Sequence, residues 1–347
     1  MTIQWYPGHI AKWDRQLDTQ LKLVDVVILV IDSRVPVATI NQDLFQRVQQ
    51  KPVLLLLNKS SLADPAQSTQ WLKHYQQEGY TALLYDAHQQ PPRQGLIRVL
   101  AQLGEPQQKK LLAKGLKRRA IRVMVVGMPN VGKSSLINSI VGRKKTITGH
   151  KAGVTRASQW VRIHPQVELL DSPGVIPPKL SGQETGALLA VVSSVGDGAY
   201  DEQAVAGFLL ARLFQLYPKA IEAAYCIDSL PAIAPSDMAV VGFVEPLEAA
   251  FDPSNAPKEM LTADRLALIG SRMLLKVAEH RGYRLSPTAW DVSRAARAVL
   301  KDFRQGRLGR MTLEPCVSPT EVPGTALAEL EEPPAVLTIE ARSDVSL

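Results

Sequence analysis

The chain has 347 residues, of which 46% are hydrophobic and 21% charged, and its formal net charge is +7. This length predicts two or three globular domains, and the absence of any run near ~18 apolar residues excludes a membrane span. The two cysteines, Cys226 and Cys316, lie too far apart for a disulfide framework or a zinc spacing. With no secretory pattern in the first residues, we expect a reducing compartment, either the cytoplasm or a plastid stroma.

Five short apolar runs predict strands in the first half of the chain. They cover residues 24–33, 52–58, 81–87, 121–127 and 167–173. Residues 69–78 and 134–141, which lie between them, are candidate helices. Continuous apolar runs are typical of a mostly parallel sheet covered on both faces, so we predict a doubly wound α/β domain. Ligands of such sheets bind at the carboxyl ends of the strands, where Asn58, Gly127 and Asp171 stand.

The pattern changes near residue 182, where Ala, Leu, Gln and Arg recur at helical spacing. We predict domains at 1–178 (α/β) and 179–312 (all-helical), followed by a tail at 313–347. The tail holds five prolines from Glu314 onward and seven acids, and we expect it to be mostly disordered.

The charge is unevenly distributed along the chain. Residues 106–167 contain fourteen Lys or Arg and no Asp or Glu, and residues 265–310 contain eleven basic residues against three acidic ones. Solvated helix faces would explain any single lysine. A stretch of sixty-two residues without an acid instead favours a polyanionic partner.

The segment GMPNVGKSS (127–135) follows a predicted strand and opens a predicted helix, which is the context of a phosphate-binding loop. Its glycines let backbone N–H groups point at phosphate oxygens, and the helix dipole adds positive charge there. Lys133 would reach the β- and γ-phosphates, and the Ser134 hydroxyl would bind Mg²⁺. The loop residues predicted to contact the nucleotide are Gly127, Asn130, Val131, Gly132, Lys133, Ser134 and Ser135.

Two further segments predict the γ-phosphate side of the same site. In LLDSPG, Asp171 would hold Mg²⁺ through water and Gly174 would offer its N–H to the γ-phosphate. Thr155, in HKAGVTR, is a candidate switch hydroxyl for the metal. A lone threonine in a loop usually has no such role, but this one lies between the phosphate loop and the Asp-x-x-Gly segment.

A base-reading corner is predicted ahead of the phosphate loop. Asn58 and Lys59 end an apolar run as in the guanine motif Asn-Lys-x-Asp, although Ser61 occupies the fourth position. Asp86 and Ala87 are predicted to form the sugar-side turn, where GTPases favour Ser-Ala. The order is a rotation of the usual GTPase order, which a sheet with neighbouring termini tolerates.

These motifs in this order resemble the circularly permuted GTPases, and specifically the YlqF/RbgA family, ribosome biogenesis GTPase A. The resemblance covers roughly residues 1–314 and is carried by WYPGHIAK, VDVVILVIDSRVP, LNK, GMPNVGKSSLIN, AGVTR, DSPGVI and DFRQGRLGRMTLE. It implies a circularly permuted P-loop GTPase domain followed by a small all-helical domain that touches ribosomal RNA. It also implies a GTPase that hydrolyses GTP slowly until it docks on a large ribosomal subunit precursor. Because the sequence has no coiled coil, no long apolar stripe and no membrane-length apolar run, we expect a monomer without a membrane partner.

The resemblance assigns two further roles. Val175 stands where many GTPases place a glutamine that orients the attacking water, so the family implies another group, for which His9 is the candidate. From the residues alone, an ordinary helix-start residue is the better explanation of His9. Asn130 is implied to help coordinate K⁺ beside the phosphates, so we expect K⁺ to stimulate turnover.

Ser61 puts guanine selectivity in question, because the usual aspartate accepts hydrogen bonds from guanine N1–H and the exocyclic amine. Asp64 could substitute only if the turn bulges, and we expect GTP binding to persist. Two alternatives to a ribosome-assembly GTPase remain. One is a nucleotide-sensing RNA-binding module with little hydrolysis. The other is a P-loop ATPase or small-molecule kinase.

Overall fold

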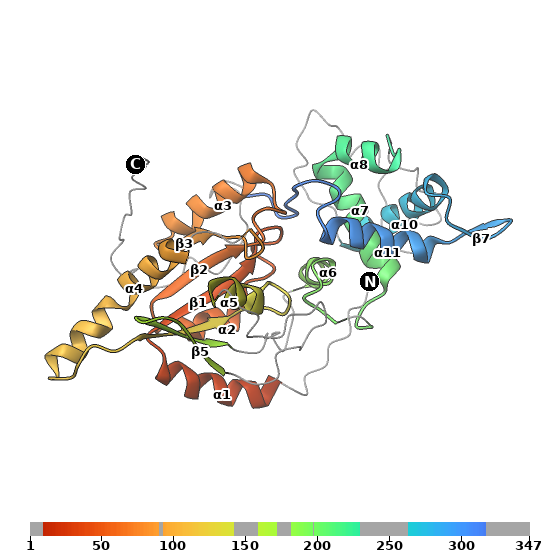
Figure 1. Cartoon of the computed structure of the whole chain (residues 1–347). Coiled ribbons are helices and arrows are strands. Elements are labelled where there is room, and N and C mark those ends of the chain that lie inside the picture. The colour runs from red at the N-terminus through yellow and green to blue at the C-terminus, as the bar shows by residue number, and fades with distance from the viewer. Residues whose placement is uncertain are drawn as a thin grey trace, which may run out of the picture.

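The structure of the chain is a computed structural model that describes residues 10–89, 93–141, 159–171, 182–196, 198–229 and 263–316. Figure 1 shows a sheet with helices on both faces, joined to a helical domain that carries a small projecting hairpin. In the ranges given, none of the helices is long and apolar enough to span a bilayer.

The α/β domain is built on a six-stranded sheet with the order β3-β2-β1-β4-β6-β5. Its strands are β1 (Val26–Asp32), β2 (Val53–Asn58), β3 (Thr81–Leu84), β4 (Ile121–Val126), β5 (Gln159–His164) and β6 (Val167–Asp171). All neighbours are parallel except β5 and β6. The five predicted strands are present, but β5 was missed because this edge strand has polar residues between its apolar ones, and so lacks a continuous apolar run.

Helices cover both faces of the sheet, as predicted for a doubly wound domain. One face packs on α1 (Ile10–Leu23), α2 (Gln42–Val48) and α3 (Pro65–Gln77), and the other on α4 (Arg93–Ala113) and α5 (Lys133–Val141). Successive strand residues alternate between the two cores, so that Leu54 and Leu56 belong to one and Leu55 and Leu57 to the other. Both cores therefore require the apolar run to be continuous.

The second domain is helical, apart from a two-stranded hairpin that the sequence did not predict. Its elements are α6 (Gln183–Val191), α7 (Glu202–Leu216), α8 (Pro218–Tyr225), α10 (Ala263–His280), α11 (Val292–Arg304), β7 (Arg284–Ser286) and β8 (Ala289–Trp290). Helices α7 and α10 cross at Gly207 and Gly270, where a Cβ on Gly270 would lie 1.8 Å from the Gly207 oxygen. The two backbones therefore touch, and neither position has room for a side chain.

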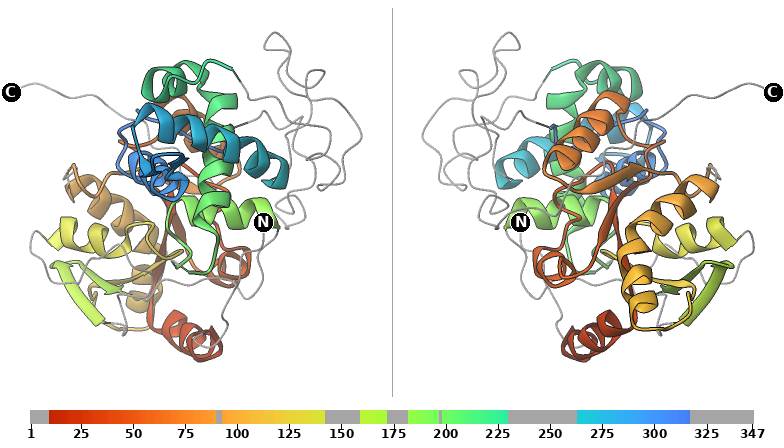
Figure 2. Two further views of the ribbon diagram at one scale, coloured as in Figure 1. Left: turned by 90° about the vertical axis from the view of Figure 1, so that its right-hand side faces the viewer. Right: turned by 90° about the vertical axis from the view of Figure 1, so that its left-hand side faces the viewer.

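The helical domain lies over the end of the sheet where β1, β2 and β4 finish, as the two views in Figure 2 show. Residues 305–316, here called the return segment, lead back from α11 onto the α/β domain. They are held by hydrogen bonds from Met311 N–H to Leu62 O (3.0 Å), Leu313 N–H to Arg34 O (2.8 Å) and Trp71 Nε1–H to Glu314 O (2.8 Å).

The return segment corrects the predicted start of the tail. Residues 313–316 were assigned to a disordered tail, but Leu313 is fully buried and the Cys316 N–H donates to Gln67 Oε1 at 2.7 Å. Composition cannot show this, because the anchoring partners lie about 250 residues earlier in the chain. Residues 317–347 lie outside the described residues.

Glu314, in the return segment, is expected to make the stability of the fold depend on pH. Its carboxylate accepts the N–H groups of Val37 (2.8 Å) and Ala38 (3.0 Å), yet burial raises its pKa from the usual 4.5 to about 7. A pKa raised by folding means that the native state binds the proton more tightly than the unfolded chain. The stability that this tighter proton binding adds to the native state is fully present below about pH 4.5 and is lost as the pH rises through about 7.

Replacing Glu314 with glutamine is therefore expected to leave stability unchanged at pH 5 and to increase it at pH 8. The amide oxygen still accepts the two N–H groups and carries no charge. Urea unfolding at both pH values measures the effect, with Glu105→Gln at a more exposed site as the matched control. A variant less stable than the wild type at pH 8 would contradict the assignment.

Candidate nucleotide-binding site

The predicted phosphate loop joins β4 to α5, and the structure requires glycine at two of its positions. Gly127 has φ +146°, and a Cβ there would lie 2.4 Å from the Val30 oxygen. Gly132 has φ +103°, and a Cβ there would lie 2.2 Å from Asn58 Nδ2. The loop therefore approaches both β1 and β2 more closely than any other residue would allow.

Lys133 begins α5 and is 6% exposed, so its stem is buried while its amino group reaches the loop. Nζ donates hydrogen bonds to the oxygens of Gly127 (3.2 Å) and Met128 (2.9 Å). Ser134 and Ser135 follow in the first turn of α5. Backbone N–H groups, a lysine ammonium and two hydroxyls thus converge at a helix N-terminus, which favours binding of an anion such as a phosphate.

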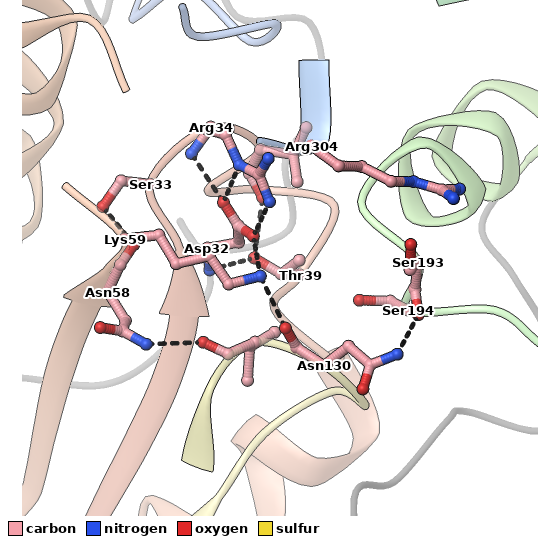
Figure 3. Close-up of polar contacts among 12 residues, drawn as sticks. Asp32, Ser33, Arg34, Thr39, Asn58, Lys59, Asn130, Ser193, Ser194 and Arg304 are labelled. Atoms are coloured by element: carbon pink, nitrogen blue, oxygen red, sulfur yellow. Dashed lines mark hydrogen bonds and ion pairs between the residues drawn. The ribbon is translucent and has the colours of Figure 1, made fainter. Parts of the chain in front are cut away.

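The predicted base corner lies directly against the phosphate loop (Figure 3). Asn58 ends β2, and its Nδ2 donates to the Val131 oxygen at 2.8 Å while its Oδ1 accepts the Ala87 N–H at 3.2 Å. Lys59 has φ +59° and donates from Nζ to the Asn130 oxygen at 2.6 Å. The structure thus brings together three segments that the sequence separates by up to 73 residues.

A buried ion cluster, which the sequence did not predict, supports the base corner. Asp32 is fully buried at the end of β1 and accepts from Arg34 Nε (2.9 Å), Arg34 Nη2 (2.8 Å) and Lys59 Nζ (2.8 Å). Burial alone would raise the pKa of Asp32, but the two cations hold it well below its usual range. The only signal in the sequence is an acid and an arginine at the end of an apolar strand.

The phosphate loop also contacts the helical domain. Asn130 has φ +58° and donates from Nδ2 to the Ser193 oxygen at 2.6 Å, and Ser194 Oγ donates to the Pro129 oxygen at 2.7 Å. Arg304 of α11 donates to the last turn of α6, reaching the oxygens of residues 190 and 191 at 2.8 Å each. Figure 3 shows this arginine extending from α11 toward α6, near Ser193.

The structure excludes Asp64 as a substitute for the usual base-reading aspartate. Its Oδ1 accepts the N–H groups of Ala66 (2.8 Å) and Gln67 (3.1 Å), so it caps the N-terminus of α3. Helix α3 accordingly begins at Pro65, four residues before the predicted start at 69. The carboxylate that contacts Ser61 is that of Asp86, which accepts both the Ser61 hydroxyl and its N–H.

Several predicted residues lie outside the described residues, namely His9, Thr155, Gly174 and Val175. Asp171 is described in its backbone, and it ends β6 opposite Val125 of β4. Since β4 leads directly into the phosphate loop, this register places Asp171 on the strand next to that loop.

A phosphate loop at the end of β4, an Asn-Lys corner bonded to it and an aspartate ending the neighbouring strand define the class of P-loop GTPases. Because the corner at residues 58–61 precedes the loop at 127–135, the order is circularly permuted. A sequence family described as 50S ribosome-binding GTPase matches residues 122–205.

Relatives in other organisms resolve the class further. Ribosome biogenesis GTPase A of Bacillus cereus is 32% identical over 314 residues, covering 90% of this chain and 94% of that protein. The Priestia megaterium protein of the same name is 34% identical over 315 residues, covering 90% and 97%. GNP-bound YlqF from T. maritima shares the fold, with a TM-score of 0.52 and 22% identity over 88% of this chain and 98% of that one. The chain belongs to the ribosome biogenesis GTPase A family, which confirms the resemblance drawn from its motifs.

Proposed function

We propose that this protein binds and hydrolyses GTP and assists assembly of the large ribosomal subunit, with slow turnover alone and faster turnover when docked. The observation that carries the proposal is the joined site, in which Asn58 bonds to Val131 and Lys59 to Asn130 across the base corner and the phosphate loop. Membership of the family supports the ribosomal role. The protein would act as a monomer in the cytoplasm or in a plastid stroma.

The residue types at the site suit Mg²⁺ and K⁺, the cations proposed to take part in GTP hydrolysis here. The Ser134 hydroxyl follows the loop and Asp171 ends the adjacent strand, and together with Thr155 they would supply the oxygen ligands that Mg²⁺ prefers. Bound Mg²⁺ would neutralise charge on the β- and γ-phosphates. Asn130, whose amide N–H donates to the Ser193 oxygen, would hold K⁺ through its side-chain oxygen.

The chain's own groups would do the rest by position and charge. Lys133 would turn from the loop carbonyls to the β- and γ-phosphates, and the Gly174 N–H would donate to the γ-phosphate. Val175 cannot orient water, so His9 would accept a hydrogen bond from the attacking water.

Two exposed basic surfaces support contact with ribosomal RNA. The first is the end of α4 and the segment after it, with exposed side chains at Lys109, Lys110, Lys114, Lys117 and Arg118. The second is the hairpin, where Arg284 stacks on the Trp290 ring and Arg294 on the Tyr283 ring, each at 4.4 Å. Guanidinium planes and aromatic rings are the groups on which unpaired RNA bases stack. In Figure 1, α4 and β7 project from opposite sides of the molecule.

GTP turnover with and without purified large ribosomal subunits tests the proposal, with ATP in parallel and with KCl replaced by NaCl in a second series. We expect stimulation by the subunits for GTP alone, and slower turnover in NaCl. Affinity for the subunits should fall with salt, with a slope of about −0.7 to −0.9 per phosphate neutralised.

Other outcomes would lead to the alternatives. Bound GTP without turnover under either condition would indicate a nucleotide-sensing RNA-binding module, which Val175 in place of glutamine favours. Equal use of ATP would indicate that guanine selectivity has been lost, and ATP that outcompetes GTP would indicate a P-loop enzyme of another class.

A further inference from the structure

The two departures of this chain from the usual guanine-binding residues are complementary. GTPases place an aspartate in the base motif and a serine in the sugar-side turn, whereas this chain has Ser61 in the motif and Asp86 in the turn. The serine and the carboxylate have thus exchanged positions, and the two side chains are in direct contact.

Strand pairing sets this contact. Strands β2 and β3 are parallel neighbours, with Leu57 opposite Leu84, so the turns that follow them lie side by side. The Ser60 N–H donates to the Tyr85 oxygen at 3.2 Å and ties the two turns together. Beyond that bond, the Ser61 hydroxyl and N–H both donate to Asp86 Oδ2, the N–H at 3.1 Å.

Asp86 is only 5% exposed, and in the described part of the chain it has no ion-pair partner. Its Oδ1 accepts the His88 N–H at 2.8 Å. A carboxylate has about four lone-pair sites, and three are occupied by these donors, so one remains on Oδ1. A buried carboxylate without a cation is costly unless its remaining capacity is used.

The same contact leaves the Ser61 hydroxyl able to act only as a hydrogen-bond acceptor toward other groups. A hydroxyl has one proton, and this one is donated to Asp86, so Ser61 Oγ is left with acceptor lone pairs only. Because its partner is charged, the hydroxyl oxygen is a stronger acceptor than in an isolated serine. The pair therefore presents acceptors on both members, no donor, and one negative charge.

We infer that Ser61 and Asp86 together form the guanine-reading acceptor of this protein, with the charge on Asp86 and the contact shared by both residues. Guanine presents two adjacent donors on its Watson–Crick edge, N1–H and the exocyclic amine, which match an acceptor-only pair. Adenine has an acceptor at N1 and would leave the pair unsatisfied. The inference rests on the proposed function, and it supplies the base contact that Ser61 alone would lack.

The other nearby carboxylates are committed elsewhere. Asp64 caps α3, and Asp32 is saturated by Arg34 and Lys59. Among the described acids at this end of the sheet, Asp86 is therefore the one beside the base motif with acceptor capacity left.

The variant Asp86→Asn tests the inference, because it should shift the preference of the site from guanine to xanthine nucleotides. An asparagine amide can donate to the 2-oxo group that xanthine carries in place of the guanine amine. We expect GDP affinity to fall by about 10²-fold, because the bond to the charged carboxylate and the bond to the Ser61 oxygen that it polarises are both weakened, and XDP affinity to rise above that of the wild type. Binding of GDP, XDP and ADP to the full chain is measured by fluorescence or calorimetry. A merely structural role for Asp86 would lower the affinity for GDP and XDP together, and this result would overturn the inference.

An exchange of the two residues provides the matched control. Ser61→Asp places two carboxylates side by side, and Asp86→Ser leaves two hydroxyls, so each single variant should lose GDP affinity. The double variant restores the usual GTPase arrangement, and its GDP affinity should return to within a few-fold of the wild type. If the loss of GDP binding free energy in the double variant equals the sum of the losses in the two single variants, the residues act independently.

Failure of this inference differs from failure of the proposed function. A wild type that binds GDP and ADP equally would contradict both. A wild type that selects GDP, with an Asp86→Asn variant that selects it equally well, would leave the GTPase proposal intact and overturn the role of the pair.

Discussion

Replacing Asp32 with alanine is expected to lower the free energy of unfolding by about 3–5 kcal/mol, because it leaves two buried cations without their counter-charge. The side chain of Arg34 is 2% exposed and that of Lys59 16% exposed, and both bond to the Asp32 carboxylate. The Arg34 guanidinium cannot reach water without disturbing its surroundings, since it also lies over the Phe303 ring at 5.2 Å.

Urea unfolding measures this loss, and Asp18→Ala is the matched control. Asp18 pairs with Arg47 at the surface, with side-chain exposures of 62% and 32%, so its loss should cost about 1 kcal/mol or less. Equal midpoints for the two variants would show that the buried cluster contributes no more than a surface pair. In that case the cations must find other partners when Asp32 is removed.

The ion cluster also forms a physical link between the nucleotide site and the helical domain. Lys59 contacts the phosphate loop and Asp32, while Arg34 contacts Phe303 of α11. Another link runs from Asn130 in the loop to the Ser193 oxygen after α6. A change in the loop on exchange of GTP for GDP would therefore act on both α6 and α11. Movement of a domain by a nucleotide-dependent contact is a known type of switch.

The sequence predicted what depends on local pattern. Continuous apolar runs predicted five strands, because strands buried on both faces lack polar alternation. The glycine spacing predicted the phosphate loop, because the loop passes so close to Val30 and Asn58 that only glycine fits. It did not predict the Ser61–Asp86 pair, the Asp32 cluster or the anchored return segment. Each of these depends on strand order or on residues far apart in the chain. Composition and periodicity cannot predict such contacts.

Replacing Lys133 with methionine is expected to lower kcat/KM for GTP by about 10²–10³-fold, the usual effect of losing one strong donor to developing charge. Methionine keeps an unbranched stem in the buried slot, where Lys133 is 6% exposed, and removes only the ammonium group. The two loop carbonyls that Nζ contacts, those of Gly127 and Met128, lose a donor, so we expect a cost in stability of only about 1 kcal/mol.

Single-turnover hydrolysis and GTP binding, with thermal unfolding in parallel, separate the two effects of Lys133→Met. The matched control is Lys219→Met, which removes an exposed lysine of α8 far from the phosphate loop and should leave both quantities unchanged. Because the lysine charge is placed to stabilise the phosphates in the transition state, the loss should be larger in turnover than in binding. A variant that hydrolyses GTP at the wild-type rate would show that Lys133 does not reach the phosphates, and that its contacts with Gly127 and Met128 only shape the loop.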